Sequence, residues 1–406
     1  MTAPYKTRFK VAKRVSLISY AIRDVIEFAK NLERKGRKIT YLNIGDPVKF
    51  DFDTPEHIKQ AMFDAIKAGE NWYSPSEGLL ELREAICRKE KRVNKIDIIP
   101  ENVVVTTGVS EAIFMVMAAI INQGDEILVP GPTYPPYTAY ARFFGGKPVA
   151  YKTIEEKGWK LDIEDMRSKI SKKTRGIVLI NPNNPCGAIY DRNSVKKVVD
   201  LAAENNLLLL ADEIYDQIVY EERFESTAHI AKDFPVVGLN GFSKAYLATG
   251  WRLGYFYFSD SEGQLETLKE GIKKETRIRL CTNTPVQRAG IAALSGPQGH
   301  IFKMVRKLRE RRDYVWGRLN EIEGISCTKP KGAFYVFPSI RDIGLRWKTD
   351  LEFVLDVLEK TGILLVHGSG FCDTYGVGHF RSTFLPSIEV LENALDMFER
   401  FMNNVS

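Results

Sequence analysis

The sequence predicts an α/β fold, in which a large domain with a central, mostly parallel sheet flanked by helices is followed by a smaller α+β domain. Three observations predict it. The chain has 406 residues, more than one hydrophobic core usually serves. From about residue 100, short apolar runs are each followed by a polar turn and a helical pattern, which is typical of parallel sheets covered by helices. After about residue 290, longer helical segments alternate with short apolar runs.

The N-terminal elements follow from apolar spacing and breakers. Residues 17–35 carry apolar side chains at helical spacing and end at Gly36, which suits a helix stop. Residues 39–44 form a short strand before the turn at Gly45, and a second helix is expected over 55–67. We expect an N-terminal arm and helix over residues 1–45 to pack on the small domain.

The remaining elements divide between the two domains, a large domain over 46–290 and a small domain over 291–406. A helix from Ser110 follows the first sheet strand. The sheet strands are expected at 103–105, 126–129, 176–180 and 207–211. The small domain is expected to contain the segments 301–320, 332–337, 351–360 and 388–403.

Composition and charge narrow the class of protein. Hydrophobic residues make up 44% and charged residues 27% of the chain, as in a soluble globular protein. The net charge of +6 is spread along the chain, which argues against nucleic-acid binding. No apolar run reaches the roughly 18 to 20 residues of a membrane helix, and residues 1–13 are basic without the apolar centre of a secretory signal. We expect a cytoplasmic enzyme that binds neither nucleic acid nor membranes.

The five cysteines lie far apart, with no Cys-x-x-Cys pair and no nearby histidine cluster. This spacing predicts neither a disulfide framework nor a zinc site, so no metal is expected. They are Cys87, Cys186, Cys281, Cys327 and Cys372.

The segment 241–254 contains a lysine and an arginine eight residues apart, Lys244 and Arg252, among apolar and small residues. Partial burial lowers the pKa of a lysine, so that its neutral amine can attack an aldehyde and shuttle protons. Arginine presents a fork of donors that matches a phosphate dianion. The pair fits a Schiff-base lysine beside a phosphate-binding arginine, and taken alone it fits a loop with two solvated cations equally well.

A carboxylate and a phenol follow the strand expected at 207–211. Asp212 stands at the end of this buried strand, where an unpaired carboxylate is costly, and Tyr215 lies three residues further on. The pyridine nitrogen of a cofactor would be a suitable partner for Asp212, which would keep the ring protonated and electron-accepting. Tyr215 could hydrogen-bond a phenolic oxygen of the same ring. Capping of a helix N-terminus is the alternative role for Asp212.

Two further turns follow expected strands. In the segment 181–187 two prolines fix the backbone, so that Asn184 can present its amide rigidly, although the segment also fits a plain tight turn. Gly108, Val109 and Ser110 begin a long apolar helix, whose N–H groups and dipole favour a phosphate; many strand-to-helix turns share this feature. Ligands collect at the carboxyl ends of parallel strands, and these residues fall at such ends.

Together these residues resemble the fold-type I, class I aminotransferases, which depend on pyridoxal 5′-phosphate (PLP). The resemblance runs in order from about residue 16 to 402, and its most specific parts are Asn-Pro-x-Asn-Pro, Asp-x-x-Tyr and Ser-Lys-x7-Arg. It implies a PLP-dependent transferase fold of type I and ping-pong exchange of an amino group between an L-amino acid and a 2-oxo acid. The residues that carry it are Gly45, Tyr73, Gly108, Val109, Ser110, Tyr134, Asn184, Asp212, Tyr215, Lys244, Arg252 and Arg381.

The resemblance implies roles around the cofactor. Lys244 is similar to the lysine that anchors PLP and moves the substrate proton, and Asp212 to the partner of the pyridine nitrogen. Asn184 and Tyr215 resemble the pair that bonds the phenolic oxygen, and Tyr134 the aromatic that stacks on the ring. The phosphate is expected to contact Gly108, Val109, Ser110, Ser243 and Arg252.

The resemblance also implies substrate contacts and an assembly. Arg381 is similar to the arginine that grips the substrate α-carboxylate in a bidentate pair, with Gly45 and Asn184 beside it. Tyr73 is similar to a residue that reaches the phosphate of the neighbouring subunit. A homodimer with shared active sites is therefore expected.

The chain departs from the family pattern at two positions. Gly241 stands where many relatives have serine, so one phosphate contact is expected to be missing, for which Ser243 could compensate. Cys186 stands where relatives commonly have threonine. Its thiol is open to oxidation near the cofactor, but we expect it to fill space.

A narrower similarity is to prokaryotic glutamate–pyruvate (alanine) aminotransferases, which implies alanine and 2-oxoglutarate as substrates. Tyr20 and Arg23 match a helix that closes over the site, and we expect them to crowd the pocket toward small side chains. Arg23 of the same chain, and Arg277 or Arg279 from the partner subunit, are rival candidates for the distal carboxylate of glutamate, and each could equally form surface or interface salt bridges. The similarity rests on segments 19–23, 131–135, 239–241, 279–287, 331–334 and 365–368.

Other functions stay open at this point. Aspartate, aromatic amino acids and valine are alternative donors, and a PLP-dependent carbon–sulfur β-lyase would share the cofactor residues. A PLP-binding regulator would need an added DNA-binding segment, for which we expect no room before residue 16. An NAD-dependent oxidoreductase is disfavoured because no Gly-x-Gly-x-x-Gly joins a strand to a helix.

Overall fold

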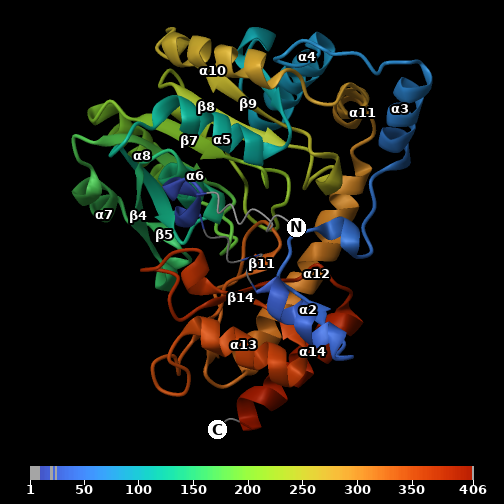
Figure 1. Ribbon diagram of the computed structural model, residues 1–406, viewed down its shortest axis with the longest axis vertical. Coiled ribbons are helices and arrows are strands. Elements are labelled where there is room, and N and C mark those ends of the chain that lie inside the picture. Colours follow the sequence, from blue (N-terminus) through green and yellow to red (C-terminus); the bar gives the residue numbers. More distant parts are fainter. Residues whose placement is uncertain (1–9, 19–21, 23–24, 405–406) are drawn as a thin grey trace, which may run out of the picture.

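The computed structural model describes residues 10–18, 22 and 25–404. Figure 1 shows an upper part built on one large sheet and a smaller lower part of helices and short strands. The strands of the large sheet, in spatial order, are β2 (Val103–Thr106), β9 (Gly254–Ser259), β8 (Val236–Gly241), β7 (Leu208–Asp212), β6 (Thr174–Ile180), β3 (Glu126–Gly131), β4 (Lys147–Ile154) and β5 (Lys160–Leu161).

The expected mostly parallel sheet is confirmed. The strands from β4 through β3, β6 and β7 to β8 all run parallel. In contrast, β9 is antiparallel to both β8 and β2, and β5 is antiparallel to β4. The strands β4, β5, β8 and β9 were not predicted. No apolar run marks β4, because it carries Lys147, Pro148 and Lys152 and is only partly buried.

Both faces of the sheet are buried, which explains the continuous apolar runs in the sequence. In β6, Ile177 and Leu179 pack in one core cluster and Val178 and Ile180 in the other, because successive side chains of a strand point to opposite faces. One face is covered by α5 (Val109–Ile120), α6 (Pro135–Phe143) and α10 (Glu266–Arg279). The other is covered by α4 (Leu80–Lys89), α7 (Ile163–Lys169), α8 (Arg192–Glu204), α9 (Thr227–Ala231) and α11 (Thr284–Ser295), and α3 (Glu56–Lys67) packs on α11.

The lower part confirms the helices expected after residue 290 to within a few residues. They are α12 (Gly299–Glu321), α13 (Asp350–Thr361) and α14 (Ile388–Asn404). No helix within the described ranges combines the length and apolar character needed to cross a membrane. The short strands here are β1 (Thr40–Tyr41) beside β13 (Ile363–Leu364), β10 (Ile325–Ser326) beside β12 (Ser339–Ile340), and β11 (Tyr335–Val336), β15 (Phe380–Thr383) and β14 (Val366–His367) in one sheet.

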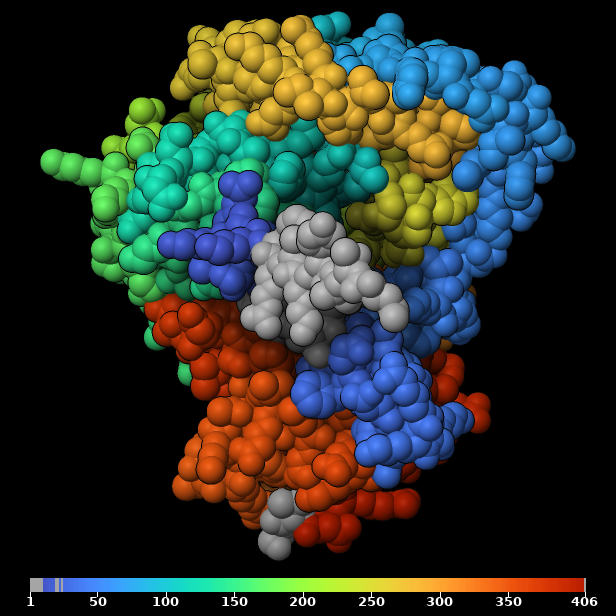
Figure 2. Space-filling model, in the orientation of Figure 1, coloured from blue at the N-terminus to red at the C-terminus, as the bar shows by residue number. Residues whose placement is uncertain are grey.

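The N-terminal segment joins the C-terminal part of the chain. The strand β1 pairs in parallel with β13, and Ala29 of α2 (Ile26–Arg34) packs in a small core with Leu358 and Leu364. Figures 1 and 2 show this blue segment lying against the orange and red C-terminal part. The domain boundaries near residues 45 and 290 stay a prediction. The helix start expected at Leu17 is wrong, because Leu17 ends a 3-10 turn and Ile18 is extended (φ −88°, ψ 124°).

Candidate active site

Polar side chains from separate strands meet at one edge of the large sheet. The carboxyl ends of β6, β7 and β8 lie together because the strands are parallel, and the start of the antiparallel β9 lies at the same edge. A cavity of about 490 Å³ opens there. Its lining includes Ile22, Ile44, Gly45, Asp46, Val109, Ser110, Tyr134, Asn184, Asp212, Tyr215, Ser243, Lys244, Thr249, Arg252, Tyr335 and Arg381.

Lys244 follows β8 and extends its amine into this cavity. Its Nζ atom donates a hydrogen bond of 2.7 Å to the carbonyl oxygen of Gly45. Burial lowers the pKa of Lys244 to about 8; Asp46 opposes this, and the positive charges of Arg381 and Arg252 reinforce it. A neutral amine is therefore accessible near neutral pH. The approach also requires glycine at position 45, because a Cβ atom there would lie 2.0 Å from the hydroxyl oxygen of Tyr335.

Asp212 ends β7 and is buried at the cavity wall. Its Oδ2 atom accepts a hydrogen bond of 2.8 Å from the Tyr137 hydroxyl, and its Oδ1 atom accepts one of 3.3 Å from the Ile214 amide. Burial raises the pKa of Asp212 to about 6, against the hydrogen bonds from Tyr137 and Ile214 and the charge of Lys244. A turn rather than a helix follows, which leaves no helix for Asp212 to cap.

Arg381, on β15, is a buried cation with neutral partners. Its side chain is 1% exposed, and it donates to the Asn184 side-chain oxygen (3.0 Å) and to the Asn43 carbonyl. Its Nε atom has no partner among the described residues. The guanidinium also lies 4.5 Å from the centre of the Tyr335 ring. Because a buried charge without a counter-charge is costly, this arrangement favours an anionic ligand.

A second cationic region of the site, besides Arg381, lies at the start of α5. Gly108 precedes that helix with φ 78°, and a Cβ atom there would lie 2.3 Å from Nη2 of Arg252. The guanidinium therefore lies directly against the helix N-terminus, where the amides of Val109 and Ser110 precede the intrahelical ladder. A helix N-terminus and an arginine together form a phosphate-binding arrangement.

The donor set as a whole fits a ring compound that carries a phosphate. Arg252 and the α5 terminus supply cationic groups, Asp212 supplies a buried carboxylate for a protonated ring nitrogen, and Lys244 supplies an amine. Asn184 and Tyr215 line the same cavity, and the Tyr215 hydroxyl lies 2.8 Å from that of Tyr335. These are the groups that could hold PLP.

Most predicted site residues within the described chain come together, and a few do not. Tyr73 is 82% exposed and does not line the cavity. Gly108 lies behind the lining, against Arg252. Tyr20 and Arg23 lie outside the described residues. The other predicted residues line the cavity: Gly45, Val109, Ser110, Tyr134, Asn184, Asp212, Tyr215, Ser243, Lys244, Arg252 and Arg381.

The two arginines at the end of α10 lie away from this cavity. Arg277 is exposed. Arg279 pairs through Nη1 with Glu111 at 2.5 Å and donates through Nη2 to the carbonyl oxygens of Ser76 and Val105. The terminal nitrogens of Arg279 are thus engaged within the chain.

The two departures from the family pattern have local explanations. A Cβ atom on Gly241 would lie 2.9 Å from the Cα atom of Gly254 on the paired strand, so the backbones here approach too closely for a hydroxyl-bearing side chain. Cys186 is buried and its thiol lies 3.1 Å from the Asn183 side-chain oxygen. Burial raises the pKa of Cys186 to about 12, which makes it an unreactive thiol.

Among the polar residues of the described site, sequence reasoning missed Asp46, Thr249, Tyr335 and Tyr137. Asp46 and Thr249 line the cavity and hydrogen-bond each other at 2.7 Å. Tyr335 contacts Tyr215, and Tyr137 contacts Asp212. A signal existed for Tyr137, which follows Tyr134 by three residues at the start of α6 and so lies on the same helical face. Tyr335 and Asp46 immediately follow segments that the resemblance had already marked.

Comparisons with known proteins identify the class to which this fold and site belong. Residues 37–398 match the family model described as aminotransferase class I and II. The chain therefore belongs to the class I and II aminotransferases, as the sequence motifs predicted.

Individual relatives narrow the similarity. The chain is 37% identical over 397 residues to the glutamate-pyruvate aminotransferase AlaA of Escherichia coli, with 97% of both chains covered. It is 38% identical over 402 residues to the alanine aminotransferase of Mycobacterium tuberculosis, and the match covers 97% of this chain and 92% of that protein. Among solved structures, the alanine aminotransferase from Pyrococcus furiosus superposes with a TM-score of 0.95 at 54% identity, with 97% of this chain and 100% of that chain covered. These similarities confirm the predicted fold class.

Proposed function

We propose that this aminotransferase uses PLP to transfer the amino group of L-alanine to 2-oxoglutarate, giving pyruvate and L-glutamate by a ping-pong mechanism. One observation carries the proposal. The amine of Lys244, with a pKa of about 8, and the buried guanidinium of Arg381, whose hydrogen-bond partners among the described residues are neutral, open onto the same cavity. Amino transfer needs both a neutral amine near the α-carbon and a cation for the α-carboxylate.

The proposed cofactor contacts follow from the charges along the cavity. Arg252 and the amides of Val109 and Ser110 would hold the phosphate, and Asp212 would hold the ring nitrogen. Asn184 and Tyr215 would contact the phenolic oxygen. When bound, PLP supplies an aldehyde that captures amino groups and a ring that accepts electrons from the substrate α-carbon.

The chain supplies orientation and proton transfer. Arg381 would bind the substrate carboxylate in a bidentate pair, which fixes the α-carbon relative to the amine of Lys244. Lys244 would take the α-proton and return it, and a proton transfer by a positioned group typically contributes about 10² to 10⁴ in rate.

The preference for alanine rests on the relatives and on the apolar part of the lining. The similar proteins named above are alanine or glutamate–pyruvate aminotransferases, and Ile22 and Ile44 line the cavity. For the distal carboxylate of glutamate, Arg23 and Arg277 remain candidates. Arg279 is the weaker one because Glu111 and two carbonyl oxygens occupy its terminal nitrogens.

A homodimer with shared active sites is part of the proposal. Four large apolar side chains are exposed: Trp72 (49%), Tyr73 (82%), Ile278 (87%) and Leu280 (50%). A hydrogen bond from the Thr284 hydroxyl to the Trp72 carbonyl oxygen joins the two segments that carry them. Clustered exposed apolar side chains of this size favour a protein–protein contact. In such a dimer Tyr73 would be free to reach the cavity of the second subunit.

A donor and acceptor panel tests the proposal. With 2-oxoglutarate as acceptor, kcat/KM should be highest for L-alanine and lower for aspartate, aromatic amino acids and valine. Cystathionine should release no pyruvate or ammonia, whereas a carbon–sulfur lyase would release both. A preference for any other donor would overturn the assignment to alanine, and the absence of a borohydride-trapped PLP adduct on Lys244 would overturn the cofactor assignment.

A further inference from the structure

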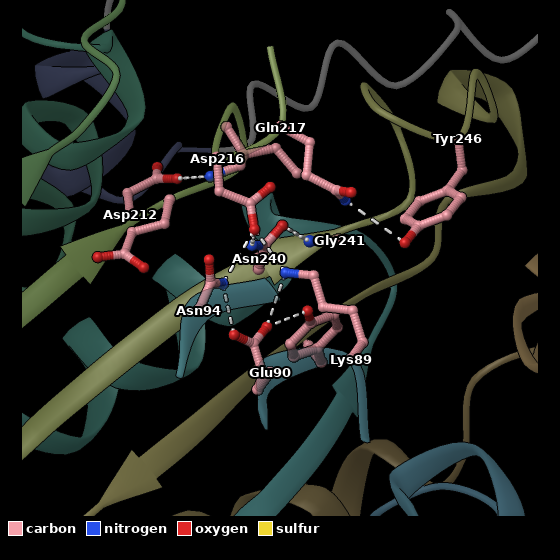
Figure 3. A network of polar contacts seen from close by, with 12 residues as sticks. Lys89, Glu90, Asn94, Asp212, Asp216, Gln217, Asn240, Gly241 and Tyr246 are labelled. Atoms are coloured by element: carbon pink, nitrogen blue, oxygen red, sulfur yellow. Dashed lines mark hydrogen bonds and ion pairs between the residues drawn. The ribbon is translucent and has the colours of Figure 1, made fainter. Parts of the chain in front are cut away.

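A second cluster of charged side chains lies beneath the loops that carry Tyr215 and Lys244, enclosed by protein and separate from the cavity lining. Its charged members are Lys89, Glu90 and Asp216, which are 1%, 0% and 4% exposed. Figure 3 shows them converging with Asn94 and Asn240. We call Lys89, Glu90, Asn94, Asp216 and Asn240 the buried network.

Three members of the buried network, Lys89, Glu90 and Asn94, lie close together in the sequence at the end of α4. Lys89 is the last residue of that helix, and a π-helical turn over Glu90–Asn94 follows it. Such single π turns are rare and occur mostly where a helix is adapted to a site. Within this turn the Asn94 amide donates to Oε2 of Glu90 at 2.6 Å, and Lys89 donates to Oε1 of Glu90 at 2.9 Å.

Lys89 also reaches across to the active-site loop. Its Nζ atom donates to Oδ2 of Asp216 at 2.5 Å. Burial alone would lower the pKa of Lys89, but the carboxylates of Asp216 and Glu90 outweigh it and hold the pKa above its ordinary value. Lys89 is therefore charged, and the network encloses one cation and two acidic groups.

Stability is a weak explanation for such a network. Enclosing charges costs desolvation energy that the ion pairs barely recover, and apolar residues of similar volume often stabilise a core as well or better. Buried polar groups are best attested where they fix one arrangement of neighbouring segments. The segments that the buried network connects therefore indicate its role.

The network joins the two loops on which the proposed chemistry depends. Oδ2 of Asp216 accepts hydrogen bonds from Lys89, from Asn94 at 3.0 Å and from Asn240 at 2.9 Å. Asp216 directly follows Tyr215. Asn240 accepts a hydrogen bond of 2.7 Å from the Gly241 amide, at the point where β8 ends and the chain turns toward Lys244. One carboxylate oxygen thus links the loop of Tyr215 to the strand that delivers Lys244, and anchors both to α4.

We propose that Asp216 and Asn240 are positioning residues, which hold the loop of Tyr215 and the chain leading to Lys244 in one fixed relative placement. Neither residue lines the cavity, so both act through Tyr215 and Lys244. The inference rests on the proposed function, because the quantity that the placement controls is the affinity for PLP and the rate at which Lys244 captures it.

A matched pair of variants tests this. Asn240→Ala removes the link between Asp216 and the Gly241 amide. Tyr255 pairs with Asn240 across β8 and β9 through the backbone, but its hydroxyl donates to Glu90 at 2.5 Å and to neither Asp216 nor Asn240, and Tyr255→Phe removes only this hydroxyl. Both variants lose buried hydrogen bonds of the same cluster, so a purely structural network would give them similar effects.

The measurements use protein freed of PLP and then titrated with PLP. Thermal unfolding of the free protein gives the structural loss, equilibrium dialysis gives the dissociation constant, and borohydride trapping followed by peptide mapping gives the rate of adduct formation on Lys244. We expect both variants to unfold at lower temperature than wild type. Only Asn240→Ala should weaken PLP binding, by about tenfold or more, and slow the adduct, because small misplacements of reacting groups are costly. Tyr255→Phe should stay within about twofold of wild type, which is less than about 0.5 kcal/mol of binding free energy, because the lost hydroxyl bonds Glu90 and neither positioning residue.

Asp216→Asn provides a second route, because it keeps the shape of the side chain and removes its charge. It should fold even if Asn240→Ala does not, and should weaken PLP binding in the same direction. Equal effects of Tyr255→Phe and the two positioning variants on the dissociation constant, or no effect of either positioning variant, would overturn the inference. Failure of the wild-type protein to bind PLP would instead overturn the proposed function, so the two failures are distinguishable.

Discussion

Glu213 offers a sharp test of how burial controls charge in this protein. It lies next to Asp212 and is buried; its Oε1 atom accepts a hydrogen bond of 2.6 Å from the Thr227 amide, and its Oε2 atom has no partner among the described residues. Burial raises the pKa of Glu213 to about 8, the nearby Ser226 hydroxyl and the hydrogen bond from the Thr227 amide oppose this, and the nearby Glu90 and Asp216 add to it. At pH 7 the side chain is therefore mainly a neutral acid.

The variant Glu213→Gln replaces the neutral acid with a neutral amide of the same shape. A carboxyl whose pKa in the folded state lies above its unfolded value of 4.5 contributes stability that is complete below that value and lost as the pH rises through about 8. Between pH 5 and pH 7.5, wild type should lose about 3 kcal/mol of unfolding free energy through this group, at about 1.4 kcal/mol per pH unit. Glutamine does not ionise, so the variant should gain that amount relative to wild type.

Calorimetric or fluorescence-detected melting of both proteins without PLP, from pH 5 to pH 7.5, measures the effect. For a chain of this size about 3 kcal/mol corresponds to a shift of about 3 to 4 °C in the unfolding midpoint. Glu262→Gln, at an exposed position, is the control and should show a constant difference from wild type. A difference between Glu213→Gln and wild type that does not change with pH, or that moves in favour of wild type, would refute the reasoning.

Three further outcomes test the proposed roles. Lys244→Ala should lose at least about 10² in kcat while it still binds PLP without a borohydride-stable adduct; turnover near the wild-type rate would exclude Lys244 as the proton carrier. Arg381→Lys replaces a fork of donors by a point charge, so kcat/KM for alanine should fall by about 10-fold or more, with PLP affinity unchanged in dialysis. Mixing Lys244→Ala subunits with Tyr73→Ala subunits should restore activity above that of either variant alone, because one site of each hybrid dimer has both residues; no gain after subunit exchange would argue against shared sites.

The sequence predicted the parallel strands β3, β6 and β7 because they are buried on both faces. Such strands read as unbroken apolar runs, as in Leu207-Leu208-Leu209-Leu210, and end at polar residues such as Asp212. The antiparallel strand β9 was missed although it completes the edge on which Arg252 lies. Its neighbour β8 contains Gly238 and Asn240, which interrupt the apolar run, and pairing between two strands leaves no local mark in either of them.

The candidate site was predictable where a residue's chemistry and its place at a strand end coincided. Residues that reach the cavity from distant parts of the chain could not be predicted. Tyr335 contacts Tyr215 only in the folded chain, because 120 positions separate the two residues in the sequence. The buried network was not predictable for the same reason: Lys89 and Glu90 are adjacent charged residues in the sequence, and only the fold encloses them with Asp216.

The charge on Lys244 results from opposing neighbours, and the largest of those that raise its pKa is Asp46. Asp46→Asn keeps an acceptor for the Thr249 hydroxyl, which now donates to Oδ1 of Asp46 at 2.7 Å, and removes only the charge. The pKa of Lys244 should therefore fall below about 8; a fall of about one unit, the low end for an adjacent charge, raises the neutral fraction at pH 7 from about 10% to about 50%. Because only the neutral amine attacks an aldehyde, the rate of borohydride-trapped adduct formation with PLP should rise about fivefold at pH 7 and be unchanged at pH 9.5. A rate–pH profile that does not move toward lower pH would show that the carboxylate of Asp46 has no influence on the amine, and that burial, the two arginines and Asp212 set its pKa.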